Sequence, residues 1–108
     1  MAVGTVFVMY PRKDGSTFNK DYYLTSHMEL CKKHWTKHGF KSWSVTEPNA
    51  DSPYICISVL EFETPEGFGN AAQDSTIKEI MEDVKNYYTE PPVIAHGPVV
   101  GRDANQVQ

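Results

Sequence analysis

Four short runs of β-branched and aromatic residues stand out along the chain, each bounded by proline, glycine or polar turn residues. They cover residues 5–10, 40–46, 54–62 and 93–100. Runs of this length and composition predict strands. The third run, YICISVLEF, is the clearest, whereas Gly97 and Pro98 interrupt the fourth run and predict an irregular strand there.

Two segments between these runs carry apolar residues three and four positions apart, which is the spacing of one helix face. The apolar positions are Leu24, Met28, Cys31 and Trp35 in the first segment and Ile77, Ile80, Met81 and Val84 in the second. The first spacing predicts a helix over residues 17–38, capped by Ser16 and ended by Gly39. The second predicts a helix that starts near residue 65, is weakened by glycines at first, and is strongest over residues 75–87.

The order strand, helix, strand, strand, helix, strand predicts the ferredoxin-like α+β fold. In this fold a four-stranded antiparallel sheet carries both helices on one face. The strands do not alternate apolar with polar residues: Phe7 and Met9 lie on one face of the first strand, and Val8 and Tyr10 lie on the other. Because the helices cover only one face, the pattern predicts a homodimer in which two copies pair sheet to sheet.

Composition and charge narrow the class of protein. The chain has 108 residues, of which 40% are hydrophobic and 22% charged, so we expect one folded domain over residues 1–108 with a frayed tail from about residue 102. The net charge of −4 argues against a nucleic-acid partner. No apolar run approaches the ~20 residues of a membrane-spanning helix. No signal segment precedes Val3, so we expect a cytoplasmic protein in which Cys31 and Cys56 are reduced and buried.

The first helix carries the candidate chemistry. Tyr23 and His27 are four residues apart, so they stack one turn apart on one side of the helix. His27 lies at the margin of the apolar stripe, from which it can project into a cavity and act as a general acid or base. The alternative is a structural histidine that hydrogen-bonds at the edge of the core. His96, in the last strand, either reaches the same cavity as His27 or belongs to the dimer contact.

Other aromatic and apolar residues either pack in the core or contact a ligand. The candidate substrate-binding residues are Tyr10, Met28, Trp43 and Phe62. Tyr87 and Tyr88 either close the mouth of a pocket or simply pack there. We expect no metal site, because His27, Cys31, His34 and His38 follow one helical line and cannot converge on one ion. The chain has no phosphate-binding glycine loop, so we also expect no nucleotide cofactor, and we assign none.

Several short motifs resemble those of the EthD family of dimeric α/β-barrel proteins. The matching segments are MYP at residues 9–11, Phe18, YLTSHMEL at residues 23–30, LEF at residues 60–62 and the closing valine-rich strand. The family pattern on the first helix is similar to Tyr-x-x-x-His-x-Pro-Leu, and this chain has Glu29 where the family usually carries proline. The resemblance spans roughly residues 5–101. It implies a dimeric α/β barrel with a cavity between helix and sheet in each subunit.

Relatives in that family include small isomerases, cyclases, dehydratases and decarboxylases that act on aromatic or polyketide-like compounds. The resemblance therefore implies a small enzyme without a cofactor that carries out proton transfer on such a compound. His27 would be the acid–base group, helped by Tyr23 and His96. Two alternatives stay open: a dimeric module that binds a small hydrophobic ligand without catalysis, and a haem- or oxygen-using monooxygenase-type relative.

Overall fold

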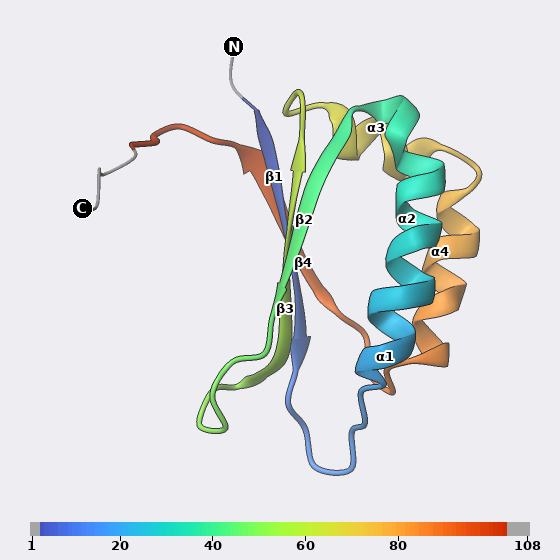
Figure 1. Cartoon of the computed structure of the whole chain (residues 1–108), viewed down its shortest axis with the longest axis vertical. Helices are drawn as coiled ribbons and strands as arrows, with labels where there is room; N and C mark the ends of the chain where they lie inside the picture. Colours follow the sequence, from blue (N-terminus) through green and yellow to red (C-terminus); the bar gives the residue numbers. More distant parts are fainter. Residues whose placement is uncertain (1–2, 104–108) are drawn as a thin grey trace.

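Four antiparallel strands form one sheet in the order β2-β3-β1-β4. In the computed structural model, which describes residues 3–103, all helices lie on one side of this sheet (Figure 1). The strands are β1 (Gly4–Pro11), β2 (Phe40–Thr46), β3 (Tyr54–Phe62) and β4 (Val93–Pro98). The ferredoxin-like α+β prediction is confirmed. The last strand ends at Pro98 and not at residue 100, and the expected frayed tail lies from residue 104 onward outside the described residues.

The first helix runs without a break over residues 20–38 but changes its pitch three times. It consists of α1 (Lys20–Tyr22), a π-helical turn (Tyr23–His27), α2 (Met28–Trp35) and a 3₁₀ turn (Thr36–His38). The wide turn is visible in the hydrogen bond that the Met28 amide donates to the Tyr23 carbonyl, five residues back. Gly39 ends the helix in a left-handed conformation (φ 89°), as predicted.

The predicted cap of this helix is wrong. Asn19 precedes the first turn, and its side chain accepts a hydrogen bond from the Tyr22 amide. Ser16 lies outside the helix, where its hydroxyl donates to the Lys13 carbonyl and closes a turn. Asn19 and Ser16 are both good capping residues, so their chemistry alone did not separate them.

The second helical segment consists of two short helices and not of one. They are α3 (Gly67–Gln73) and α4 (Ile77–Asp83), and a 3₁₀ turn (Val84–Asn86) continues α4. The break falls at Asp74, whose backbone is extended and whose carboxylate accepts hydrogen bonds from the amide and hydroxyl of Thr76. A side chain that satisfies the backbone amide two residues on favours a turn over a continued helix.

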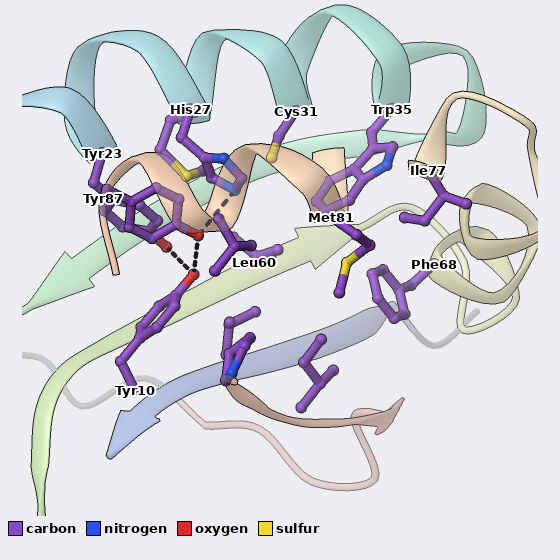
Figure 2. A pocket seen from close by; sticks show the side chains of 15 residues that line it. Tyr10, Tyr23, His27, Cys31, Trp35, Leu60, Phe68, Ile77, Met81 and Tyr87 are labelled. Atoms are coloured by element: carbon purple, nitrogen blue, oxygen red, sulfur yellow. Dashed lines mark hydrogen bonds between the residues drawn. The ribbon is translucent and has the colours of Figure 1, made fainter. Parts of the chain in front are cut away.

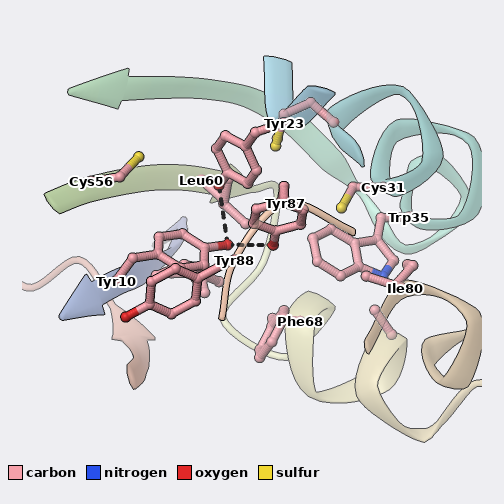
Figure 3. Packing of buried hydrophobic residues seen from close by; sticks show 14 of the residues in the cluster. Tyr10, Tyr23, Cys31, Trp35, Cys56, Leu60, Phe68, Ile80, Tyr87 and Tyr88 are labelled. Atoms are coloured by element: carbon pink, nitrogen blue, oxygen red, sulfur yellow. Dashed lines mark hydrogen bonds between the residues drawn. The ribbon is translucent and has the colours of Figure 1, made fainter. Parts of the chain in front are cut away.

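The core lies between the helices and one face of the sheet. Its strand residues are Val6, Val8, Tyr10, Cys56, Ser58, Leu60 and Phe62, and its helix-layer residues include Tyr23, Met28, Cys31, Trp35, Phe68, Ala71, Ile80, Tyr87 and Tyr88. Figure 3 shows Tyr10 and Tyr88 at one end of this core and Trp35 and Ile80 at the other. Residues 6, 8 and 10 of β1 share one face of the strand, as predicted, and this face is the one that the helices cover.

The other face of the sheet carries apolar side chains that no helix covers. We call Phe7, Met9, Ile57, Val59, Val93 and Ala95 the open sheet face, because the strand register places them together. Phe7 is 43% and Val93 45% exposed. Within residues 3–103, no helix is long and apolar enough to cross a membrane.

Candidate functional site

A cavity lies between the first helix, the 77–87 segment and the helix-facing side of the sheet (Figure 2). Its volume is about 40 Å³, or about 460 Å³ when the open space at its mouth is included. One end is polar and is lined by Tyr10, Tyr23, His27 and Tyr87; the rest is apolar and includes Trp35, Phe68, Ile77, Met81 and Ile94. Among the described residues that line it, none carries an aspartate, glutamate, lysine or arginine side chain.

His27 comes from the π-helical turn and lies at the polar end of the cavity. Its side chain is held on both sides: Nδ1 lies 2.9 Å from a carboxylate oxygen of Asp83, and Nε2 lies 3.3 Å from the hydroxyl of Tyr87. The residue is only 5% exposed. Burial lowers the pKa of His27 below its ordinary value, although the neighbouring Asp83 opposes this shift. The imidazole is therefore neutral at pH 7.

Asp83, the last residue of α4, fixes the orientation of this imidazole. Its carboxylate accepts hydrogen bonds from the Tyr22 hydroxyl at 2.6 Å and from the Asn86 side-chain amide at 2.9 Å. Burial raises the pKa of Asp83, but the hydrogen bonds from Tyr22, Asn86 and His27 outweigh burial and hold the pKa below its usual range. An ionised Asp83 accepts the Nδ1 proton of His27, which leaves Nε2 as the acceptor nitrogen.

Three tyrosine hydroxyls extend the polar end away from His27. The Tyr10 hydroxyl lies 2.8 Å from that of Tyr87 and 3.4 Å from that of Tyr23, and its one proton can go to either neighbour. Tyr23 in turn hydrogen-bonds to the buried hydroxyl of Ser58. Burial raises the pKa of Tyr10 and of Tyr87, and it raises that of Tyr23 to about 12. All three hydroxyls are therefore protonated at neutral pH.

Four of the residues predicted for the site meet at this cavity. They are Tyr10, Tyr23, His27 and Met28. Tyr23 and His27 stack with ring centroids 5.5 Å apart and nearly parallel planes, as their spacing predicts. The predicted residues of the polar end thus come from β1 and from the first helix, which lie on opposite sides of the cavity, and Tyr87 joins them from the segment after α4.

The other three predicted residues lie elsewhere. His96 shares the helix-facing side of the sheet with Val6, but it is exposed, contacts Phe68 at 4.9 Å between ring centroids, and does not line the cavity of His27. Phe62 is fully buried among aromatic core residues. Trp43 is 38% exposed on edge strand β2, where it lines a separate surface hollow.

The sequence did not single out Asp83, and it offered Tyr87 only as a packing or mouth residue. A signal was present, because Asp83 and Tyr87 are four residues apart and so share one side of a helix beside the apolar stripe of Ile80 and Val84. The sequence does not specify how this helix is rotated about its axis where it packs against the first helix. That rotation brings Asp83 to His27 across 56 residues of chain.

Two other histidines of the first helix also pair with carboxylates of the second helical segment. His34 Nε2 lies 2.9 Å from Glu79, and His38 Nε2 lies 3.0 Å from Asp74. With His27 and Asp83, these pairs join the two helical segments at three levels. In the part of the chain that the structure describes, no group of three or more histidine, cysteine, aspartate or glutamate side chains is arranged to hold a metal ion.

Comparison with known proteins places the fold. Neither a protein-family model nor a curated protein sequence matches this chain. Among solved structures, an EthD-like protein from Ralstonia eutropha JMP134 is similar at a TM-score of 0.83 and 24% identity, over 98% of this chain and 99% of that one. An ethyl tert-butyl ether D (EthD) family protein from Bacillus halodurans C-125 gives a TM-score of 0.58 at 17% identity, over 88% of this chain and 97% of that one.

A third similar structure has a stated activity. SnoaB, a cofactor-independent oxygenase from Streptomyces nogalater, gives a TM-score of 0.59 at 12% identity, over 95% of both chains. Identities this low establish the fold and not the chemistry. The resemblance to EthD proteins that the sequence motifs indicated is thus confirmed for the fold: this chain has the fold of EthD-like proteins.

Proposed function

We propose that this protein is a small enzyme that needs no cofactor and carries out proton transfer on an aromatic or polyketide-like molecule bound in the cavity of His27. Isomerisation, cyclisation, dehydration and decarboxylation all fall within this chemistry. One observation carries the proposal: a buried, neutral imidazole, oriented by an ionised carboxylate, stands at the polar end of an otherwise apolar cavity.

The arrangement suits general acid–base catalysis. A neutral His27 accepts a proton at pH 7, and Asp83 at 2.9 Å then stabilises the imidazolium that forms. The protonated tyrosine hydroxyls at the same end are hydrogen-bond donors for an oxygen on which negative charge develops. The apolar walls suit a flat hydrophobic substrate. A ligand with a full charge would find no charged partner among the described residues that line the cavity.

The cavity must widen before it admits such a substrate. A volume of about 40 Å³ holds only about three water molecules. This volume is far below the usual range of ligand pockets, roughly 300–1,000 Å³. Met81 and Ile94 line the cavity and are 45% and 38% exposed, so their side chains have room to turn outward. Met81 is also flexible, with an unbranched side chain.

A second candidate function is a module that binds a small hydrophobic ligand without catalysis. The observation that favours it is that the protein itself satisfies both nitrogens of His27. The same observation counts against the haem-binding alternative at this site, since an axial ligand needs a free imidazole nitrogen. The oxygenase activity stated for SnoaB supports chemistry without a cofactor on this fold.

The test uses 2-tetralone, an enolisable aromatic ketone, as a probe of size and chemistry. We expect the protein to bind it and to speed the exchange of its α-protons in D₂O, followed by NMR. His27→Gln should lower this rate by at least ~100-fold, whereas His34→Gln, at the exposed pair with Glu79, should not change it. Binding without accelerated exchange would favour the binding module. If the protein neither binds 2-tetralone nor speeds the exchange of its α-protons, both functions are contradicted.

We also propose that two copies pair through the open sheet face to form a dimeric barrel, and that the protein is cytoplasmic. The apolar side chains that no helix covers support the first proposal. The second is supported by Cys31 and Cys56, which are buried and free of a disulfide.

A further inference from the structure

The hydrogen bonds of His27 leave neither ring nitrogen free for a substrate. A neutral imidazole has one donor nitrogen and one acceptor nitrogen. Here the donor, Nδ1, is bound to Asp83 at 2.9 Å, and the acceptor, Nε2, faces the Tyr87 hydroxyl at 3.3 Å. A substrate that met His27 directly would have to displace one of these partners.

The direction of these hydrogen bonds follows from Asp83. An ionised carboxylate can only accept, so the Nδ1 proton points to Asp83 and the Tyr87 proton points to Nε2. The Tyr87 oxygen keeps its lone pairs for another donor. The Tyr10 hydroxyl lies 2.8 Å away and fills this position whenever it donates to Tyr87 and not to Tyr23. Figure 2 shows the resulting line of contacts from His27 through Tyr87 to Tyr10.

Tyr87 is well placed to face a ligand. It follows the 3₁₀ turn after α4, lies in the wall of the cavity, and packs its ring 4.6 Å from that of His27 and 4.8 Å from that of Tyr23. Burial raises the pKa of its hydroxyl, so Tyr87 is not a base through ionisation. It can take up a proton only while it passes its own proton on.

We infer that the Tyr87 hydroxyl is the group that exchanges a proton with the substrate, with His27 behind it as the proton acceptor and Asp83 as a positioning residue. This inference rests on the proposed function. With an enolisable ketone, the α-carbon–hydrogen bond breaks and its proton bonds to the Tyr87 oxygen, while the Tyr87 proton moves to Nε2 of His27. The electron pair of the broken bond becomes the enolate, and the new imidazolium is paired with Asp83. Reversal of these transfers returns the proton to the product.

The decisive comparison is between Tyr87→Phe and Tyr88→Phe. Both residues are buried tyrosines of the same segment, but the Tyr88 hydroxyl donates to the Pro11 carbonyl and takes no part in the cavity. Tyr87→Phe should reduce the α-proton exchange of 2-tetralone by at least ~100-fold and change its dissociation constant by no more than ~10-fold. Tyr88→Phe should keep the wild-type rate.

The outcomes separate this inference from the function on which it rests. If His27→Gln loses the exchange and Tyr87→Phe keeps it, the relay through Tyr87 is overturned and the proposed function stands. If both variants exchange like wild type, the proposed function itself fails. Circular dichroism and thermal unfolding establish that each variant is folded. If Tyr87→Phe does not fold, a measurement on the wild type tests the relay instead. NOEs from the α-protons of bound 2-tetralone should be stronger to the Tyr87 ring than to the His27 ring. The reverse order would overturn the relay.

The positioning role of Asp83 has its own readout. Asp83→Asn should shift the ¹⁵N resonances of His27 from the Nδ1–H tautomer toward the Nε2–H tautomer, and exchange should fall because Nε2 no longer accepts from Tyr87. Asp74→Asn, at the pair with His38, should leave the His27 tautomer and the exchange rate unchanged. An unchanged tautomer in Asp83→Asn would contradict the role assigned to Asp83.

Discussion

At the scale of single residues, the buried imidazole of His27 links the stability of the fold to pH. Burial lowers the pKa of His27 in the folded protein, whereas the unfolded chain titrates near ~6.5. The unfolded state therefore binds a proton first as the pH falls. The contribution of neutral His27 to stability is complete above ~6.5 and is lost as the pH falls toward the folded pKa.

We accordingly expect the free energy of unfolding to fall between pH 7 and pH 5, and to fall less in His27→Gln than in the wild type. Urea denaturation at several pH values measures this. Tyr88→Phe serves as the control, because it removes a buried hydroxyl that does not contact His27. Equal slopes in His27→Gln and the wild type would mean that His27 is not held neutral by the fold.

At the scale of elements, the docking of α3 against the end of the first helix depends on one glycine. A Cβ atom at Gly67 would lie 2.7 Å from the His38 carbonyl oxygen and 2.8 Å from the ring of Phe62. The carbonyl belongs to the backbone and cannot turn aside. Gly69, in the same helix, has nothing within 4 Å of its Cβ position. The two glycines therefore allow a matched comparison within one helix.

We expect Gly67→Ala to destabilise the protein by about 1–3 kcal/mol through overpacking. Gly69→Ala should stabilise it by up to ~1 kcal/mol through helix propensity. Thermal or urea unfolding of both variants tests whether the free energy of unfolding falls in Gly67→Ala and rises in Gly69→Ala. A neutral Gly67→Ala would show that α3 moves away from His38 without cost.

How much the sequence predicts also depends on the element. Residues 40–46 and 54–62 were predicted with the bounds observed, because each run is strongly β-branched or aromatic and ends at turn residues. The helix over the second half was predicted as one piece, because the break depends on the carboxylate of Asp74 satisfying the Thr76 backbone. The helical stripe placed Tyr23 and His27 correctly on one side. It carried no information on Asp83, which reaches His27 only through tertiary packing.

At the scale of the whole molecule, the open sheet face is an apolar surface that no helix of residues 3–103 covers. Phe7 stands on the central strand β1, and its register partners Val59 and Ala95 are also apolar or small. Exposed apolar surface of this kind on a central strand is typical of an interface.

We expect the wild type to run as a dimer in size-exclusion chromatography with light scattering, and Phe7→Glu to run as a monomer, because burying an unpaired carboxylate between two sheets is costly. Met81→Glu is the matched control: Met81 is 45% exposed, close to the 43% of Phe7, but lies on the helix side. A monomeric wild type at high micromolar concentration, or a dimeric Phe7→Glu, would contradict pairing through this face.

The π-helical turn at Tyr23–His27 has a consequence for how such a site can change over evolution. A π-helical turn is equivalent to an ordinary α-helix with one residue inserted. Deleting one residue here would restore α-helical pitch, so the segments on either side would stay close to their places, whereas the side chains within the turn, Tyr23 among them, would point in new directions. A change in length of one codon can therefore exchange the polar end of the cavity and preserve the scaffold around it. Among proteins of this fold, we expect gaps in sequence alignments to gather at this turn wherever the ligand differs.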